Sequence, residues 1–568
     1  MSFFSRICWR SPAALAAGLV FSWNLSAQPP ARPPAPPTPT FGADNVQDLT
    51  RGPIHEAFAQ PTVFNPEPGP VVPKKPPELI DEVPPDQKPE GNNVVWIPGY
   101  WGWDDESKGF LWVSGFWRSV PPDRVWVPGY WNATDGGYQW VSGYWGPAQA
   151  TEAVYLPPPP ESLETGPTTE AVEDGVVWIP GVWVWRDTRY WWRPGFWTRA
   201  NPDWVWVPAH YEWSPSGYVF VDGYWDYPMF DRGLLFAPVV FTSVPAAGFV
   251  FTPSVVIDLR FLAGALFVRP AWDHYYFGDY YDPSYSKAGI YPWFAFHNSR
   301  FGYDPLFVQT SFVYSRRDPQ WLPRVRETFL TRRENPSARP PHTLRQFNDW
   351  VRKVDPTGRG AESVAFVKPL ADVTRLRDFP VRLERLDAAR QTTTRTQSQA
   401  LQKFRSERIR MEQDAARDLP RGGTATEPGA TRRPGRTAPA RLKMPEPPRM
   451  SQTPPGVGGK TAPPAGVGTG TTGRRAIPPE APRVPELAPP RAGTQTEPRE
   501  ARHPLPLPED NLRPPAGTAV PKGRIGEPAP SPPPKTSPPG RAEPPPAHKE
   551  PPKSSPPKKD GKDGKDKD

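Results

Sequence analysis

Trp96-Ile97-Pro98-Gly99-Tyr100-Trp101 is the stretch that decides the fold, because six-residue segments of this pattern recur seven more times. Clear copies span 112–117, 126–131, 140–145, 178–183 and 192–197, and looser copies span 206–211 and 220–225. The copies begin 16, 14 and 14 residues apart in a first quartet and 14 residues apart in a second. Trp, Tyr, Phe and Val are typical of a pleated, half-buried surface, and turn residues separate the copies. The repeats therefore predict an ordered centre that is mainly β.

Each clear copy has a glycine at its fourth position, namely Gly99, Gly115, Gly129, Gly143, Gly181 and Gly195. Two tryptophans five positions apart would face opposite sides of a regular strand, because side chains alternate with period 2. A glycine with positive φ would form a bulge that brings both rings to one face. Proline at the third position of four copies lacks an N–H group, which also suits a bulge or an edge.

The alternative is a type II turn at Pro-Gly that pairs the two tryptophans of one copy across a tight hairpin. Better turn residues lie between the copies, for example Asp135-Gly136-Gly137 and Ser214-Pro215-Ser216-Gly217. We therefore favour the bulge, with each quartet forming an up-and-down antiparallel meander.

Composition separates the centre of the chain from its ends. The chain has 568 residues with 88 prolines, and its 25 tryptophans all lie at or before Trp350. From Arg421 onward there are 26 Lys and Arg against 15 Asp and Glu, with no aromatic side chain of Trp, Tyr or Phe. Such a segment does not bury a core. We expect antiparallel meanders in the ordered centre, an α-helical segment after them, and extensive disorder at both ends.

The same patterns predict eight stretches along the chain. A signal peptide is expected over 1–27, a Pro-rich linker over 28–93, the first quartet over 94–147 and an acidic Pro-rich linker over 148–175. The second quartet covers 176–226, an aromatic-rich β or irregular region 227–317, a helical region 318–417, and a disordered basic tail 418–568. One helix is expected to begin at Asp318 or at Pro323, a second follows Thr343, and 379–417 has the composition of a long polar helix.

The first 27 residues predict export to the periplasm, the cell surface or the medium. Arg6 and Arg10 precede an apolar run over 13–21, and Leu25-Ser26-Ala27 is a plausible cleavage site. Cleavage would remove Cys8, the one cysteine, which excludes disulfides and thiol catalysis in the mature chain. The uncharged run 237–257 contains three prolines and predicts short strands, so we expect no transmembrane span.

The repeats resemble the bacterial WXXGXW (YXWGXW) repeat proteins, which are secreted proteins without an established activity. The resemblance rests on the six clear hexamers, such as Trp126-Val127-Pro128-Gly129-Tyr130-Trp131, and covers roughly residues 94 to 226. The seventh copy departs from the pattern, with Ala209 in place of glycine and Tyr211 in place of the last tryptophan. The resemblance implies a repeat module and supplies no catalytic residues.

Polar residues outside the repeats do not match a known catalytic pattern. No phosphate-binding loop, zinc-protease helix motif or nucleophile elbow appears. Asp273, His274, Asp279 and Asp282 could suggest a metal site, but their spacing fits no ligand pattern and favours a Tyr-rich loop. Asp104-Asp105-Glu106 lies beside a turn and is interpreted as a solvated loop, and His210 as a half-exposed strand residue. We therefore expect no enzyme, with no catalytic, cofactor or metal residues.

The tryptophan rows allow two interpretations. They can fill the core of small sheets, or their rings can lie exposed and stack on sugar faces. For the second interpretation the candidate stacking residues are Trp101, Trp117, Trp131, Trp145, Trp183, Trp197 and Trp225. The basic tail could attract an anionic envelope polymer, whereas nucleic acid is disfavoured because the tail has no aromatic ring for base stacking. We favour a structural or protein-interaction module, with glycan binding as the alternative. The sequence does not indicate the oligomeric state.

Overall fold

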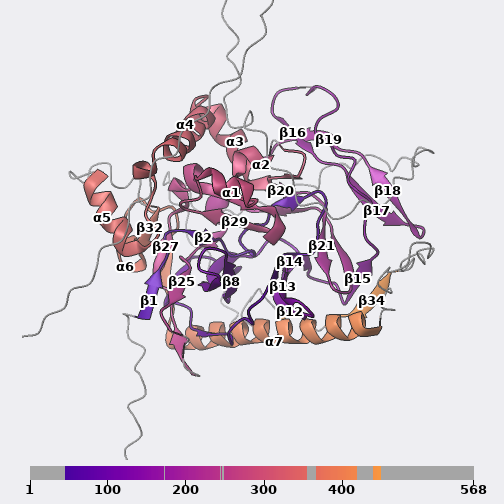
Figure 1. The fold of residues 1–568 in the computed structure, drawn as a ribbon, viewed down its shortest axis with the longest axis horizontal. Coiled ribbons are helices and arrows are strands. Elements are labelled where there is room, and N and C mark those ends of the chain that lie inside the picture. Colours follow the sequence, from indigo (N-terminus) through magenta and orange to yellow (C-terminus); the bar gives the residue numbers. More distant parts are fainter. Residues whose placement is uncertain are drawn as a thin grey trace, which may run out of the picture. The chain divides into compact units, whose positions relative to one another are not determined.

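The computed structural model describes residues 45–354 apart from 172, 244, 246, 247 and 298, and then 366–418, 439–444 and 446–448. The chain divides into two compact units, 1–514 and 515–568, and every described residue belongs to the first. The predicted fold class is confirmed, because the centre is mainly antiparallel strands and the helices follow from residue 283 onward (Figure 1). The predicted signal peptide and most of the predicted disorder lie outside the described residues.

Each of the first two copies supplies two short strands, because its third and fourth residues, the second of which is the glycine, make no ladder hydrogen bonds. β7 (Val94–Ile97) ends before Pro98-Gly99, and β8 (Tyr100–Asp104) begins after it. The second copy gives β9 (Gly109–Val113) and β10 (Phe116–Ser119) in the same way. β8 pairs with β9 and β7 pairs with β10, both antiparallel. Two consecutive copies thus form one long hairpin that is interrupted in its middle, which we call a repeat pair.

The other six copies form three more repeat pairs. In repeat pair 2, β11 (Arg124–Val127) joins β14 (Tyr144–Pro147), and β12 (Tyr130–Thr134) joins β13 (Gly137–Val141). In repeat pair 3, β16 (Val176–Ile179) joins β19 (Phe196–Arg199), and β17 (Val182–Arg186) joins β18 (Arg189–Arg193). In repeat pair 4, β20 (Val205–Val207) joins β23 (Tyr224–Asp226), and β21 (His210–Ser214) joins β22 (Gly217–Val221).

The register places the recurring aromatic positions of each repeat pair directly opposite one another. Trp96 lies opposite Trp117 and Trp101 opposite Trp112, with edge-to-face rings whose centroids are 5.2 and 5.3 Å apart. The tryptophan pairs of repeat pairs 2 and 3 lie opposite each other in the same way. Edge-to-face pairs of this kind stabilise a sheet beyond the area they bury.

The arrangement within a copy differs from both predicted alternatives. The bulge is wrong, because the two strands of one copy belong to different sheets and the glycines of the six clear copies have no φ in the left-handed region. The tight Pro-Gly hairpin is also wrong, since Trp101 pairs with Trp112 of the next copy. In the part of the chain that the structure describes, ladders join repeat strands only within a repeat pair, so a quartet is two hairpins in place of one four-stranded meander.

Short strands from outside the repeats extend these hairpins and form further sheets. The larger sheets have the orders β1-β25-β9-β8, β24-β10-β7, β12-β13-β4, β21-β22-β15-β34 and β2-β29-β28-β30. The added strands are β1 (Val46–Asp48), β2 (Gly52–Pro53), β4 (Val71–Val72), β15 (Glu152–Leu156), β24 (Gly233–Leu234), β25 (Val239–Phe241), β28 (Leu266–Arg269), β29 (His274–Phe277), β30 (Tyr291–Pro292) and β34 (Ala440–Lys443). Two-stranded ladders complete the set with β3 (Thr62–Val63), β5 (Asp81–Glu82), β6 (Gln87–Pro89), β26 (Val250–Phe251), β27 (Val255–Ile257), β31 (Gly302–Tyr303), β32 (Val367–Pro369) and β33 (Leu383–Arg385).

Segments that the sequence assigns to linkers and tail contribute to this core. Residues 50–59 are buried almost throughout, and the Ile54 N–H donates to the Tyr275 carbonyl at 2.8 Å. β15 lies in the predicted acidic linker, and β34, from the predicted tail, pairs with it and buries Ala440. Proline-rich composition therefore does not keep these segments out of the core, because short strands need only a few ladder bonds beside a proline.

The helices begin at residue 283, and three of them lie in the stretch 227–317, which the sequence predicts as β or irregular. They are α1 (Pro283–Lys287), α2 (Trp293–His297), α3 (Pro305–Arg317), α4 (Trp321–Glu334), α5 (Leu344–Val354), α6 (Leu370–Val373) and α7 (Ala388–Asp418). Five 3-10 turns accompany them at Met229–Asp231, Leu259–Phe261, Ala263–Ala265, Pro270–Trp272 and Pro336–Ala338. α5 follows Thr343 as predicted, and α4 begins between the two predicted starts. The missed helices are α1, α2 and α3, of which α3 has a clear signal, because Asp304 caps it and Pro305 occupies its first turn.

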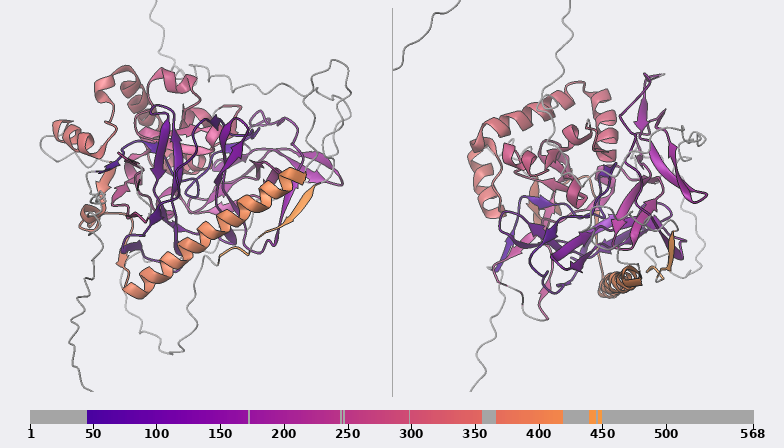
Figure 2. Two further views of the ribbon diagram at one scale, coloured as in Figure 1. Left: turned by 60° about the horizontal axis from the view of Figure 1, so that its bottom comes forward. Right: turned by 45° about the vertical axis from the view of Figure 1, so that its right-hand side comes forward.

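The long helix α7 lies along the repeat strands. Figure 2 shows it running across the strands of the centre, and its residues contact β7 and β12. Leu401 and Phe404 are buried in the main cluster together with Trp96, Trp126 and Tyr275. Repeat pairs 1, 2 and 4, the later sheets and the helices therefore share the main core, whereas repeat pair 3 packs in a smaller cluster with Leu156, Ala209 and Tyr211. In the described residues, no helix has both the length and the apolar character needed to cross a membrane.

Candidate functional site

The glycines of the repeats are required by contacts across the repeat pair. A Cβ atom on Gly115 would lie 2.3 Å from Glu82 Oε2 and 2.7 Å from Trp96 Cζ2, and one on Gly143 would lie 2.5 Å from Trp126 Cζ2. Real side chains do not tolerate such distances. The glycine therefore makes room for the indole of the partner copy and for a carboxylate beside it.

That carboxylate belongs to Glu82 in repeat pair 1. Gly99 N–H donates to Glu82 Oε2 at 2.8 Å, and Gly115 N–H donates to Oε1 at 2.9 Å and to Oε2 at 3.1 Å. Trp112 Nε1–H donates to Glu82 Oε1 at 3.0 Å. The side chain is 2 % exposed. One glutamate thus satisfies the backbone of both copies where their ladder is interrupted, which is where the N–H groups would otherwise be buried without acceptors.

Repeat pair 2 repeats this geometry with a different glutamate. Gly129 N–H donates to Glu56 Oε1, and Gly143 N–H donates to Glu56 Oε2, both at 3.1 Å. Trp140 Nε1–H donates to Glu56 Oε2 at 3.2 Å. Glu56 is 1 % exposed and precedes the repeats in the sequence, as Glu82 does. The arrangement is therefore a recurring feature of the repeat pair.

Repeat pair 3 recruits Glu164, which lies in the predicted acidic linker. The Gly181 N–H donates to Glu164 Oε2, and Trp178 Nε1–H donates to Oε1 at 3.0 Å. The Gly166 N–H donates to the same Oε1 at 2.8 Å from within the segment that carries the glutamate. Glu164 is 7 % exposed. We call Glu82, Glu56 and Glu164 the clamp glutamates.

The segments that carry the clamp glutamates also accept hydrogen bonds from other indoles of the repeats. The Glu78 carbonyl accepts from Trp101 Nε1–H at 2.9 Å, and the Ala57 carbonyl accepts from Trp145 at 3.1 Å. In repeat pair 3 the carbonyls of Glu161 and Thr169 accept from Trp183 and Trp197 at 3.0 and 3.1 Å. We call residues 78–82, 56–60 and 161–169 the companion segments of repeat pairs 1, 2 and 3.

The clamp glutamates of repeat pairs 1 and 2 lie in an interior of low polarity. Burial raises the pKa of Glu82 to about 7 and that of Glu56 to about 7, although the N–H donors oppose both shifts. Arg405 of α7 is buried near both carboxyls, and desolvation lowers its pKa to about 10 while the glutamates oppose that shift. Helix α7 therefore brings a positive charge beneath the first two repeat pairs.

A second buried contact joins α7 to repeat pair 2. Arg408 Nη1 donates to the Pro128 and Ser142 carbonyls at 2.8 and 3.1 Å, which are the residues just before the two repeat glycines. Arg408 Nε donates to Glu412 at 2.8 Å, and the Tyr130 hydroxyl donates to the same carboxylate at 2.6 Å. In repeat pair 2, Arg408 of α7 thus satisfies the carbonyls beside the interruption of the ladder, and Glu56 satisfies the N–H groups.

The predicted stacking residues have two kinds of surroundings. Trp101, Trp117 and Trp145 are 4, 1 and 3 % exposed and pack in the hydrophobic clusters. Trp131, Trp183, Trp197 and Trp225 are partly exposed. All four repeat tryptophans of repeat pair 3, Trp178, Trp183, Trp192 and Trp197, are partly exposed, as are the two of repeat pair 4, Trp206 and Trp225. The register places Trp183, Trp185, Tyr190 and Trp192 on one face of β17 and β18.

The four residues considered for a metal site each contact a different partner. His274 lies against the Tyr100 hydroxyl, and burial lowers its pKa to about 4. Asp273 faces Glu212, Asp279 contacts His342 and Asp282 caps α1. No cluster of three or more His, Cys, Asp or Glu side chains suited to a metal occurs among the described residues.

The two other polar groups considered in the sequence also take part in ion pairs. Asp105 pairs with Arg269, and Glu106 with Arg51 at 2.7 Å. His210 is 8 % exposed, so its predicted half-exposure is wrong, and its Nε2 lies 3.4 Å from Glu212 Oε1. The two acidic side chains thus tie the turn to Arg269 of β28 and to Arg51, whereas the His210 contact lies within β21.

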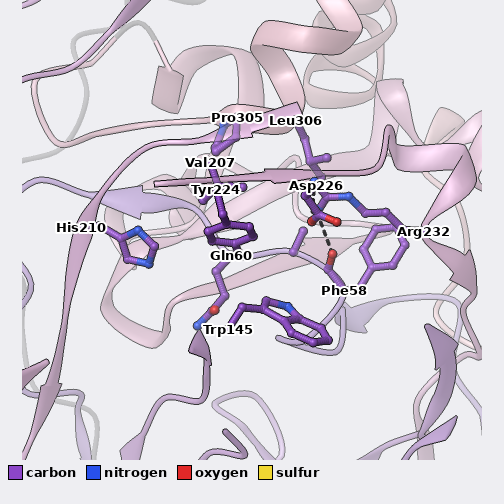
Figure 3. A pocket seen from close by; sticks show the side chains of 11 residues that line it. Phe58, Gln60, Trp145, Val207, His210, Tyr224, Asp226, Arg232, Pro305 and Leu306 are labelled. Atoms are coloured by element: carbon purple, nitrogen blue, oxygen red, sulfur yellow. Dashed lines mark hydrogen bonds and ion pairs between the residues drawn. The ribbon is translucent and has the colours of Figure 1, made fainter. Parts of the chain in front are cut away.

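Two small cavities lie between the elements. The first, drawn in Figure 3, is about 10 Å³ and lies between Trp145, Tyr224 and Leu306. The second is about 20 Å³ and is lined by Trp140, Ser142 and Asp273 among others. Each volume suits about one water molecule, whereas pockets for small-molecule ligands are roughly 300 Å³ or more.

The clamp glutamates are the residues that the sequence does not reveal. Each is an isolated glutamate in a Pro-containing segment, with an apolar neighbour such as Ile54, Ile80 or Leu163 one or two positions before it. The signal that could have found them is a glutamate among apolar residues in a segment otherwise interpreted as solvated.

Comparison with protein families agrees with the structural unit. The WXXGXW repeat family, whose unit contains two copies, matches residues 91–118, 125–145, 174–198 and 201–226. Each match covers one repeat pair. Comparison with curated proteins and with solved structures gives no match. The two-copy unit and the four hairpins coincide, and the protein is therefore a WXXGXW repeat-containing protein with four repeat pairs between residues 91 and 226.

Proposed function

We propose that this protein is an exported, non-enzymatic cell-envelope protein whose repeat region is a structural or protein-interaction module. One observation carries the proposal. The repeat glycines and indoles donate their hydrogen bonds to the clamp glutamates inside the protein, so these residues build structure. Residues 1–27 support export through their basic and apolar pattern. The basic residues from Arg421 onward support salt-sensitive attraction to an anionic envelope polymer.

Export and interaction can be tested together on the full chain. We expect the mature protein to be recovered from the envelope or the medium with Gln28 as its first residue. Amine-reactive cross-linking of intact cells should give adducts with envelope proteins. A chain that stays in the cytoplasm with Met1 intact, or that gives no adduct in the envelope, would contradict the proposal.

Glycan binding through repeat pair 3 is a second candidate, favoured by its partly exposed aromatic face. The ring centroids of Trp185 and Tyr190 are 4.9 Å apart in an edge-to-face contact, and Arg189 lies over the Trp191 ring at 4.3 Å. Partly exposed aromatic rings suit stacking on the flat faces of ligands, and loss of one such ring costs about 1–3 kcal/mol where the ligand is a nucleobase.

Sedimentation with insoluble cell-wall glycan distinguishes this candidate from a purely structural role. We expect Trp185→Ala to weaken co-sedimentation about tenfold, as loss of a stacked ring should. Trp213→Ala is the matched control, because Trp213 is also a partly exposed strand tryptophan but lies outside repeat pair 3. Equal co-sedimentation of both variants and the parent chain would remove the glycan candidate.

A further inference from the structure

We propose that repeat pair 4 is a binding site for an extended, proline-containing peptide of a partner protein that presents a glutamate side chain. The inference rests on the interaction role proposed above and names the chemistry of the partner. It follows from comparing what covers the first three repeat pairs with what the fourth offers.

The first three repeat pairs show which ligand this geometry takes. Each is covered by a companion segment that is preceded closely in the sequence by a proline, namely Pro53, Pro77 or Pro160. Each companion presents one glutamate side chain to glycine N–H and indole N–H groups, and that glutamate is 7 % exposed or less. A repeat pair is therefore a receptor for a segment that presents one glutamate, and in these three cases the segment belongs to the same chain. In repeat pair 1 this segment is extended, because it includes β5.

Repeat pair 4 has the same geometry. Trp206 lies opposite Trp225 with ring centroids 5.0 Å apart, and a Cβ on Gly223 would lie 2.5 Å from Trp206 Cζ2. These values match those of the clamped pairs, where Trp178 lies 2.3 Å from the equivalent position on Gly195. The interruption of the hairpin between β20 and β21 is thus formed in the same way as in the other repeat pairs.

Among the residues that the structure describes, no glutamate occupies the position in repeat pair 4 that the clamp glutamates occupy in the other three. No side-chain carboxylate there accepts from the N–H groups of Ala209 or Gly223. Trp225 Nε1 is buried without an acceptor, as Trp117 Nε1 is in repeat pair 1, whereas the equivalent nitrogens of Trp145 and Trp197 donate to companion carbonyls. A buried donor left without an acceptor costs about 1–3 kcal/mol, so a peptide that supplied one would gain a comparable amount.

The surroundings favour an acidic peptide. Gly223 and Trp225 are partly exposed, and the neighbouring Asp222 is exposed. Arg124 donates to the Asp222 and Gly223 carbonyls at 3.2 and 3.1 Å and lies over the Tyr224 ring at 4.6 Å. This arginine brings positive charge next to the glycine step, which attracts a carboxylate and offsets the charge of Asp222.

The test uses a fluorescein-labelled peptide that copies residues 75–85, which include the companion segment of repeat pair 1. We expect saturable binding to the full-length protein by fluorescence anisotropy. Glu82→Gln in the peptide should weaken binding at least tenfold, because a charge-assisted acceptor is lost. In the protein, Trp225→Phe should weaken binding several-fold, because it removes one indole donor while keeping an aromatic ring.

Trp117→Phe is the matched control, because Trp117 Nε1 is also buried without an acceptor but lies in repeat pair 1, which already has its companion. This variant should bind as the parent does. A photo-cross-linker at the Leu79 position of the peptide should attach within residues 201–226.

Three results would overturn the inference: no saturable binding, equal binding of the Gln peptide, or cross-links within residues 94–119, which would mean displacement of the chain's own companion. Failure of the peptide while intact-cell cross-linking still yields envelope partners would leave the proposed function standing. Failure of both experiments would remove both.

Discussion

Glu82→Ala should lower the free energy of unfolding by roughly 3–5 kcal/mol at pH 5, the range expected when a buried polar network loses its central partner. The substitution leaves the Gly99 and Gly115 N–H groups and the Trp112 indole N–H without their acceptor in a site that is 2 % exposed. It also opens space between two packed copies. Urea unfolding of the full chain, followed by tryptophan fluorescence, measures the effect.

Glu78→Ala is the matched control for this loss. Glu78 lies in the same companion segment, its side chain is exposed, and its backbone carbonyl, which accepts from Trp101, remains. Surface substitutions of this kind change stability by about 0.5 kcal/mol or less. A Glu78→Ala variant as unstable as Glu82→Ala would show that the segment matters and the buried carboxyl does not.

The loss on Glu82→Ala should also depend on pH. The pKa of Glu82 is about 7 in the folded chain, above the ordinary value of 4.5, so the folded state holds a proton that the unfolded state releases between these values. The contribution of this group to stability is therefore full below pH 4.5 and is lost as the pH rises through 7. Between pH 5 and pH 8 the difference between the parent chain and Glu82→Ala should shrink by about 2–3 kcal/mol. A difference that grew with pH would mean that the carboxylate is bound in its charged form.

The sequence predicts the strands of this fold well and their partners poorly. Alternating Trp, Val and Tyr with turn residues every 14 residues identifies antiparallel strands, and Thr343 correctly marks the start of α5. The role of Gly99 and its equivalents could not be decided, because a glycine required for positive φ and a glycine required for close packing look the same in a sequence. Only the position of Trp112 across the hairpin distinguishes the two explanations.

The clamp glutamates could not be predicted for a different reason. Glu82 lies 17 residues before Gly99 and 33 before Gly115, so no local periodicity connects them. Its neighbours Pro84 and Pro85 place it in a segment that composition assigns to a linker. Burial of an isolated carboxyl is rare unless partners satisfy it, and here the partners are backbone N–H groups, which every sequence contains.

The same packing explains the departure of the seventh copy and gives the second large prediction. Ala209 stands where the other odd copies have glycine, and Phe220 stands opposite, where they have Trp112, Trp140 or Trp192. In repeat pair 3 a Cβ on Gly181 would lie 2.5 Å from Trp192 Cζ2. A phenyl ring does not reach as far as an indole, so the smaller ring makes room for the methyl group. Ala209 and Phe220 pack in the same hydrophobic cluster.

Gly181→Ala alone should therefore destabilise repeat pair 3 by about 2–3 kcal/mol through overpacking. Trp192→Phe alone should cost about 1–2 kcal/mol for the ring that is lost. Together they should cost less than the sum by at least about 1 kcal/mol, because the second change removes the clash of the first. Hydrogen exchange of the amides over residues 176–199 gives the opening free energy of this hairpin directly.

Gly136→Ala is the matched control for the added methyl group. Gly136 lies in an exposed turn without positive φ, and its Cβ would meet Val71 Cγ1 only at 3.8 Å. It should change stability by about 0.5 kcal/mol or less, because the added methyl group makes only an ordinary van der Waals contact and lowers the entropy of the unfolded chain. Additive losses for Gly181→Ala and Trp192→Phe would mean that the glycine is required by the Arg193 carbonyl and the Gly195 N–H, each 2.9 Å from the same Cβ position, and not by the indole. A coupling of the expected sign would show that glycine and tryptophan specify each other across every repeat pair, and that Ala209 and Phe220 are the same solution with a smaller ring.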